Sequence, residues 1–199
     1  VLEQISETGA RSNALFSRSI GELFETVLAS GRRDAEFASH LMVDLLDRNL
    51  YERANDCRWW AQAPELRSLM ADVTLNLHTP QDLATAQRIL EHINSLYTVY
   101  TRLMVYDRQG RVLASSHAQL GNGSSVVGTP IEADTLAAVL QLGDTQSYHV
   151  TPWRPSVHYD GGCTYVYHAA IRAPGDDTQI VGGVGIVFNA ADEFHAMLQ

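Results

Sequence analysis

The sequence is short of basic residues and of long apolar runs, and each shortage argues against a class of protein. Its 14 lysines and arginines stand against 23 aspartates and glutamates, for a formal net charge of -9. Without a basic cluster, we expect no nucleic-acid partner. No apolar run approaches the roughly 20 residues that span a bilayer, and no charged-then-apolar leader opens the chain. The chain as given is expected to be soluble, and its start at Val1 suggests an excised piece.

Cysteine is also scarce, and the two present match no metal-ligand spacing. Cys57 and Cys163 are either two buried thiols or the ends of one long-range disulfide, and composition leaves both open. The eight histidines include no CxxCH motif and no pair at i and i+4. We therefore expect no metal and no cofactor, and keep a haem or metal sensor as a rival interpretation.

Signatures of catalysis are missing as well. Neither cysteine lies in an activating context such as a nucleophile elbow. The Gly121 to Gly123 segment precedes no Lys-Ser/Thr pair, so it is not a phosphate-binding loop. We expect no catalytic residue and no enzymatic activity.

What the chain does have is enough apolar content for one core and one chemically dense stretch. Its 199 residues are 45% hydrophobic and 19% charged, which suits a single domain. The segment 50–60 reads LYERANDCRWW. At helical spacing one stripe of it is apolar and suits a core, while a neighbouring face is polar. The apolar stripe holds Leu46, Leu50, Ala54, Cys57 and Ala61, and the polar face holds Asp47, Tyr51, Asn55 and Arg58.

The first half of the chain is expected to be helical. Residues 1–30 and 32–62 form two amphipathic patterns separated by Gly31, which can end or bend the helix. The first apolar stripe either packs on its own domain or pairs with a second copy as a parallel helix. Pro64 starts a short helix, and Thr79, Pro80 and Asp82 predict the start of another that runs to about residue 96.

The second half changes to the period of strands. Residues 97–116 predict a hairpin that turns at 108–110, and a loop and a short helix over 130–142 follow. Three strands are expected at 146–153, 163–173 and 180–188, the last of them apolar on both faces and therefore central. A final helix begins at 191. The fold class is α+β with a mostly antiparallel five-stranded sheet. We expect one domain over 1–199, with long helices in 1–62, helices in 63–96, the sheet and a ligand pocket in 97–190, and a signalling helix from 191–199.

These segments carry a resemblance to a known family. The hairpin SLYTVYTRLMVYDRQGRVLASS, the strand ending in TPW, and CTYVYHAAIRAP leading to IVGGVGIVFNAADEF resemble Cache sensor domains of bacterial chemoreceptors and other transducers, of the single, PAS-like type. The resemblance implies a periplasmic domain of a receptor anchored by membrane helices outside this sequence, which binds a small molecule. Tyr51, Arg58 and Trp60 are similar to a motif of the amino-acid-binding members but at a different spacing, so amino-acid binding is not carried over.

A ligand pocket needs aromatic walls and a few convergent polar groups, with arginine able to hold a carboxylate through two hydrogen bonds. In the strand 163–173, odd and even residues face opposite sides. Trp59 and Trp60 cannot both face one pocket, and each histidine has a structural alternative as a satisfied polar group. The candidate ligand-binding residues are Arg58, Trp60, Tyr148, Trp153, Arg154, His158, Tyr165, Tyr167 and His168.

The periplasmic address that the resemblance implies favours a disulfide between Cys57 and Cys163. The expected function is a periplasmic sensor of a small organic carboxylate, in a transmembrane receptor of the methyl-accepting chemotaxis type. An amine or a nitrogen heterocycle is the second choice of ligand. The alternatives are a haem or metal sensor, or a protein-binding module of a histidine kinase or a cyclic-nucleotide enzyme. The apolar stripe of the N-terminal helix is compatible with a homodimer formed through that helix.

Overall fold

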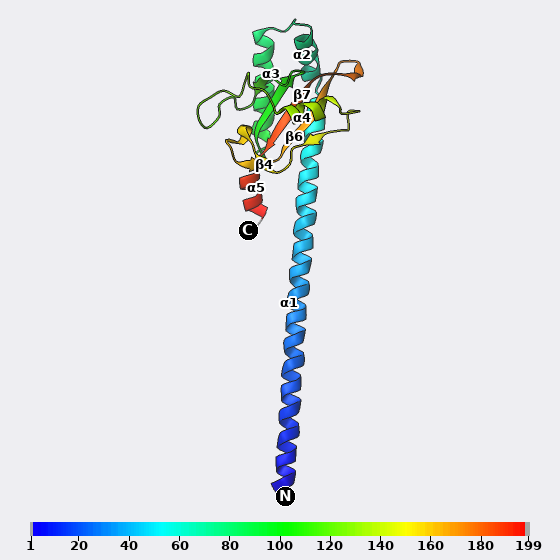
Figure 1. The fold of residues 1–199 in the computed structure, drawn as a ribbon, viewed down its shortest axis with the longest axis vertical. Coiled ribbons are helices and arrows are strands. Elements are labelled where there is room, and N and C mark those ends of the chain that lie inside the picture. Colours follow the sequence, from blue (N-terminus) through cyan, green and yellow to red (C-terminus); the bar gives the residue numbers. More distant parts are fainter. Residues whose placement is uncertain (1, 198–199) are drawn as a thin grey trace. The chain divides into compact units, whose positions relative to one another are not determined.

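The fold is known from a computed structural model, which describes residues 2–197 (Figure 1). The chain divides into two compact units, residues 1–48 and 49–199. The elements follow in the order α1 (Leu2–Ala61), α2 (Pro64–Thr74), α3 (Pro80–Leu96), β1 (Tyr100–Asp107), β2 (Val112–Ser115), α4 (Ala133–Leu140), β3 (His149–Val150), β4 (Arg154–Pro155), the 3-10 turn η1 (Val157–Tyr159), β5 (Cys163–Thr164), β6 (Val166–Ala173), β7 (Asp176–Phe188) and α5 (Ala190–Met197). No helix within residues 2–197 is both long and apolar enough to cross a membrane.

The expected break at Gly31 is wrong, because α1 continues through it. A glycine inside a helix costs only about 1 kcal/mol relative to alanine, and no turn signal follows Gly31 to use its freedom. The helix start at Thr79 is confirmed. The Thr79 hydroxyl accepts from the Asp82 amide, and the Asp82 carboxylate accepts from the Thr79 amide, which forms a capping box.

The sheet has the strand order β2-β1-β7-β6-β3 and is antiparallel at every pairing. The predicted hairpin is confirmed as β1 and β2. Its turn is held by the Asp107 carboxylate, which accepts from the amides of Gln109 and Arg111, and Gly110 adopts a positive φ of 81° there. The strand predicted at 180–188 is confirmed as the central strand, since β7 pairs with both β1 and β6.

Two predicted strands are shorter than the pattern indicated. Of residues 146–153 only His149–Val150 pairs with β6, because the amides of Gln146 and Ser147 donate to the Asp144 carboxylate in a turn and Pro152 has no amide hydrogen to extend the ladder. The strand predicted at 163–173 divides at Tyr165. Its first two residues pair with β4 in a separate two-stranded sheet, and Val166–Ala173 forms β6. The final helix, α5, is described to Met197, so the last two residues of the predicted helix lie outside the described range.

One face of the sheet is covered by α2, α3 and the last turns of α1. In Figure 1, α2 and α3 run side by side over the sheet. The core between these helices and the sheet is apolar, and the buried part of the predicted stripe, Ala54, Cys57 and Ala61, contributes to it. Leu66 and Ile186 are completely buried there. We call this side of the sheet the helix face.

The opposite face is covered by α4 and by the loops between β2 and β6, and we call it the α4 face. Its apolar core is small and includes Met104 and Tyr106 of β1. On this face the central strand carries glycine instead of side chains. A Cβ at Gly185 would lie 2.8 Å from Cε of Met104 and 3.2 Å from the ring of His168, and a Cβ at Gly183 would meet the Tyr106 ring. The GGVG segment therefore makes room for Tyr106 and His168 over the middle of the sheet.

Both cysteines are free thiols, so the disulfide predicted between them is not formed in this structure. Cys57 is completely buried on the helix face, where its thiol lies 4.0 Å from the carbonyl oxygen of Val184. Cys163 is exposed in β5, opposite Pro155 of β4. The glycines before Cys163 belong to the turn 156–162 and do not bring β5 to the helix.

Candidate ligand-binding site

The alternation predicted for the strand 163–173 is confirmed and divides the candidate residues between the two faces. Tyr167 is buried in the core of the helix face, and Tyr165 packs against that core. His168 is buried on the α4 face, over Gly185. The nine candidate residues therefore do not form one cluster.

Arg58 lies on the helix side and is occupied by contacts within the protein. Its guanidinium donates to the carbonyl oxygen of Gln146 at 2.8 Å and to the side-chain oxygen of Asn55. The guanidinium carbon lies 5.6 Å from the ring centroid of Tyr148 and 6.0 Å from that of Tyr51. Arg58 and Tyr148 are thus brought together, and their contacts tie the end of α1 to the segment before β3.

The tryptophans divide as the sequence indicated. Trp59 is 78% exposed, while Trp60 packs edge-on against Tyr97 and Tyr100 at 5.4 and 5.5 Å between ring centroids. Trp153 lies elsewhere, with its ring 5.1 Å from that of Tyr165 and 5.5 Å from that of Phe194 in α5. Trp60 therefore belongs to the core, and Trp153 connects the segment before β4 to the C-terminal helix.

Three histidines come together on the α4 face, and we call His149, His158 and His168 the imidazole cluster. His149 of β3 lies directly opposite His168 of β6 in the ladder, with 6.3 Å between ring centroids. His158 belongs to the turn η1, and it lies close enough to His168 for its charged form to lower the pKa of His168. His158 is 2% exposed and His168 is 1% exposed. His158 and His168 of the cluster were among the candidate residues, whereas His149 was not.

Three ring nitrogens of this cluster are buried without a hydrogen-bond partner among the described residues. They are Nδ1 and Nε2 of His158 and Nε2 of His168. An unpaired buried polar group costs about 1–3 kcal/mol, so proteins seldom retain several together unless they serve a purpose. The cluster is the clearest departure from a satisfied core in the described chain.

The protonation of the cluster follows from its burial. The pKa of His168 is lowered to about 3, first by burial and then by the nearby charges of His149, His158 and Arg154. Burial also lowers the pKa of His149 and of His158. His168 is therefore neutral at physiological pH.

Tyr106 is the hydrogen-bond partner of one ring nitrogen of His168. The Tyr106 hydroxyl lies 3.1 Å from Nδ1 of His168, and burial raises the pKa of this tyrosine, so the hydroxyl remains protonated. We assign the hydroxyl as donor to Nδ1. The proton of His168 then lies on the unpartnered Nε2, where it can be donated to an acceptor.

Two arginines border the cluster. Arg154 pairs with Asp134 of α4 at 3.1 Å and donates to the hydroxyl of Thr135 at 3.5 Å. Arg102 is 5% exposed and donates to three main-chain carbonyls, those of His117, His158 and Gln119, at 2.6–2.9 Å. Burial lowers the pKa of Arg102. The α4 face thus carries positive charge on two arginines whose donors are engaged within the protein.

Arg102 and Tyr106 were missed at the sequence level. A signal was present, since strand alternation in TRLMVYD places Arg102, Met104 and Tyr106 on one face, and a charged residue inside an apolar strand is uncommon. That this face is the one His168 occupies depends on the pairing of β1 and β6 with β7.

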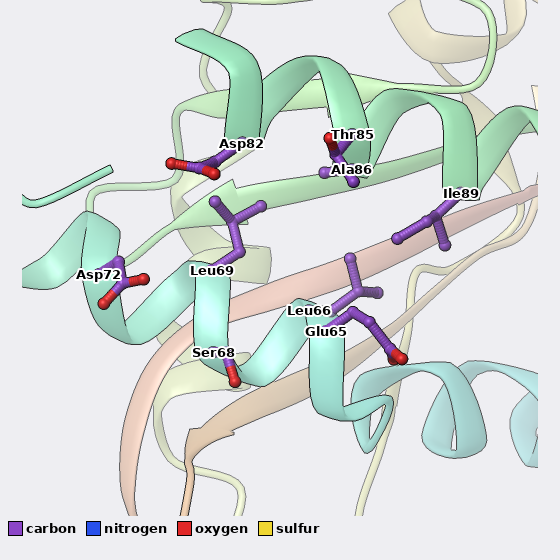
Figure 2. Close-up of a pocket in the computed structure, with 9 residues that line it drawn as sticks. All are labelled: Glu65, Leu66, Ser68, Leu69, Asp72, Asp82, Thr85, Ala86 and Ile89. Atoms are coloured by element: carbon purple, nitrogen blue, oxygen red, sulfur yellow. The ribbon is translucent and has the colours of Figure 1, made fainter. Parts of the chain in front are cut away.

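Hollows in the surface lie away from the imidazole cluster. One between α2 and α3, of about 180 Å³, has an apolar floor that includes Leu66, Leu69 and Ala86, and its charged groups are the carboxylates of Glu65, Asp72 and Asp82 (Figure 2). Asp82 is also engaged in the helix cap. Negative charge at the rim disfavours a carboxylate ligand there.

A second hollow lies beside Arg58, with Asn55, Trp59, Gln62 and Gln146 around it. The guanidinium of Arg58 is already bonded to two of these residues. Between residues 2 and 197, no group of three or more His, Cys, Asp or Glu side chains is arranged to hold a metal ion.

Comparison with known proteins shows similarity in fold. No protein-family model matches the sequence, and no curated protein matches it. The sensor domain of the V. cholerae histidine kinase DctB is similar over 79% of this chain, at 15% identity and a TM-score of 0.62. The match covers 55% of the DctB chain, so this chain spans little more than half of its length. The E. coli DcuS sensor domain matches over 76% of this chain and 97% of its own, at 19% identity and a TM-score of 0.54. The chain therefore has the PAS-like fold of Cache-type sensor domains, as the resemblance in sequence implied.

Proposed function

We propose that this chain is the extracytoplasmic sensor domain of a transmembrane receptor and that it binds a small organic carboxylate at the imidazole cluster. The observation that carries the proposal is the set of three buried imidazole nitrogens without partners, on His158 and His168. The similarity in fold to sensor domains supports the general role. We propose no catalytic step, since the cluster contains hydrogen-bond donors and no activated nucleophile.

The chemistry of the cluster favours an anionic acceptor. Nε2–H of His168 and one ring N–H of His158 can each donate to a carboxylate oxygen. Arg154 lies close enough for its positive charge to lower the pKa of His168. Hydrogen bonds to an ionised group are worth about 1.5–3 kcal/mol each, more than bonds between neutral groups. A carboxylate would therefore satisfy donors that the protein leaves unpaired, whereas an amine would add a further cation beside Arg154.

Ligand access requires movement of the cover. His158 and His168 are almost completely buried; α4 contacts β3 and β6, and His158 is itself part of the turn η1. A ligand can reach the imidazoles only if one of these elements shifts, so binding favours the arrangement that admits it.

The test is a thermal-shift screen of the purified domain against mono- and dicarboxylates of two to six carbons, amino acids, amines and purines. At 100 times the dissociation constant, a ligand adds about 2.7 kcal/mol of stability. We expect the stabilising compounds to be carboxylates and their effect to be lost in His158→Gln. Arg58→Ala is the matched control, because Arg58 is bonded within the protein, and it should retain the effect. Loss of the effect in Arg58→Ala with full retention in His158→Gln would reject this site.

We propose further that α1 pairs with a second copy of the chain. Between residues 5 and 45 the helix exposes a stripe of large apolar side chains, of which Phe16, Ile20 and Leu23 are 64–70% exposed. An isolated helix of this kind gains little stability by itself, whereas two helices paired along such a stripe bury it. Sedimentation should show a dimer that Ile20→Glu dissociates and that Ala29→Glu, on the opposite side of the helix, leaves intact. A monomer in the unmodified protein would reject the pairing.

The proposal also includes the class of receptor to which this domain belongs. The resemblance in the strands points to a chemoreceptor, and the similar DctB domain belongs to a histidine kinase. We propose a chemoreceptor, in which the carboxylate acts as the signal. A fusion of this domain to the cytoplasmic half of a chemoreceptor should respond to the compound found in the screen, and a silent fusion that still binds the compound would count against this class.

A further inference from the structure

The turn of residues 156–162 lies between the imidazole cluster and the C-terminal helix α5. It is internally bonded: the amides of Tyr159 and Gly161 donate to the carbonyl oxygen of Ser156, and the amide of Gly162 donates to that of Tyr159. The Ser156 hydroxyl accepts from the His158 amide at 3.2 Å. Such a turn can move as one body, because displacing any part of it breaks several of these bonds.

Two adjacent residues of the turn, His158 and Tyr159, contact different parts of the fold. The side chain of His158 belongs to the imidazole cluster, and its carbonyl accepts from Arg102 at 2.6 Å. The hydroxyl of the next residue, Tyr159, donates to the side-chain oxygen of Asn189 and accepts from the amide of Ala191, each at 3.1 Å. Asn189 immediately precedes α5, and Ala191 lies in its first turn.

The Tyr159 ring is held where this contact needs it. A Cβ at Gly162 would lie 2.8 Å from Cδ1 of Tyr159, so the glycine leaves the space that the ring occupies. α5 also makes an apolar contact with the rest of the domain, in which Phe194 packs against Trp153 and Phe188. The hydroxyl of Tyr159 is thus a polar connection between the turn and the start of α5, beside an aromatic contact that does not involve His158.

We propose that Tyr159 couples the imidazole cluster to α5, so that movement of the turn on ligand binding loosens or tightens the first turn of the helix. This inference rests on the proposed function for the identity of the site. It adds the residue through which occupancy of the cluster reaches a different element of the fold.

The test is a double-mutant cycle read by hydrogen exchange of a peptide covering residues 189–196. Tyr159→Phe keeps the ring and removes the hydroxyl, and we expect exchange at the start of α5 to rise about fivefold, the factor for one ordinary hydrogen bond. His158→Ala should change exchange in the same peptide, and it should have no further effect once Tyr159 is Phe. Tyr165→Phe, whose ring contacts Trp153, is the matched control and should leave the effect of His158→Ala intact.

Two results would overturn the coupling. One is an effect of His158→Ala of equal size with and without the Tyr159 hydroxyl, and the other is no effect of His158→Ala on α5 in the unmodified background. If His158→Ala does not fold, His158→Gln takes its place in the cycle. Because the cycle contains no ligand, its failure rejects the Tyr159 connection alone, and failure of the carboxylate screen rejects the proposed function alone.

Discussion

The two faces of the sheet are both buried, yet they are built from different chemistry. The helix face is filled by apolar side chains such as Leu66, Leu103 and Ile186, all with no exposed surface. The α4 face buries His158, His168 and Arg102, with the His168 ring over Gly185 of β7. Burial of apolar area stabilises a fold, whereas unpaired polar groups cost free energy. The comparison indicates that the helix face holds the domain together, and the α4 face is where we propose that the ligand binds.

The largest expected effect is on the helix face. Ile186→Ala should lower the free energy of unfolding by about 3 kcal/mol, because the substitution leaves a cavity in the middle of the apolar core. Val157→Ala, at a residue that is 62% exposed in η1, is the control and should change stability by less than about 0.5 kcal/mol. Urea unfolding at pH 7.5 measures both. If Ile186→Ala lowers the free energy of unfolding by less than 1 kcal/mol, the helix face is not the main source of stability.

The next effect is a dependence on pH that comes from the α4 face. The pKa of His168 is about 3 in the folded chain and 6.5 by its ordinary value, so between these pH values the unfolded chain binds the extra proton. Stability is therefore fully present above about pH 6.5 and is lost as the pH falls. At pH 5 this residue alone should lower the free energy of unfolding by about 2 kcal/mol relative to pH 8.

Two variants test whether His168 causes this loss of stability at low pH. His168→Asn should flatten the dependence between pH 5 and pH 8, and His92→Asn, at an exposed position in α3, should preserve it. The lowered pKa values of His149 and His158 add to the loss with the same sign. An unchanged slope in His168→Asn would show that His168 is accessible to protons and not part of a closed site.

A smaller effect, of opposite sign, is expected at His158. Both of its ring nitrogens are buried without a partner among the described residues, so His158→Leu removes an unfavourable group from a closed site. We expect an unchanged or higher stability, by up to about 1 kcal/mol, together with loss of ligand binding. Destabilisation by more than 2 kcal/mol would mean that His158 is structural, and the α4 face would then resemble the helix face.

The smallest effect is expected from reduction. A disulfide between Cys57 and Cys163 would contribute roughly 4–5 kcal/mol in the chain-entropy model. Since both thiols are free, dithiothreitol should leave the melting temperature unchanged. Thiol titration of the native protein should find Cys163 reactive and Cys57 unreactive, because burial raises the pKa of the Cys57 thiol. Finding one disulfide bond per chain after denaturation without reductant would contradict the structure.

Much of the fold followed from the sequence because it depends on local rules. The capping residues at Thr79 fixed the start of α3, and the period of two in the segment 163–173 separated Tyr167 from His168. The apolar run of β7 indicated a central strand, as its pairing with β1 and β6 confirms. The predicted strand at 146–153 is too long because Pro152 ends the ladder and Asp144 holds Gln146 and Ser147 in a turn.

Residue type and spacing do not determine which distant groups meet. Arg58 was a reasonable anchor for a carboxylate, yet in the folded chain its donors go to Gln146 and Asn55. His158 lies in a turn with no periodicity to orient it, and its main chain is held by the Ser156 hydroxyl and by Arg102, which is distant in sequence. The two cysteines were compatible with a bond in sequence and are separated by the folding of β5 onto β4.

The sequence by itself determined the class of fold, its central strand and the opposite orientation of neighbouring residues in β6, because hydrophobic period and capping act over a few residues. Only the tertiary structure decided that the α4 face is the polar one. That outcome depends on strand order, which places Tyr106 of β1 and His168 of β6 on either side of the glycines of β7. Contacts across the sheet join residues more than 60 positions apart, a separation over which no local pattern carries information.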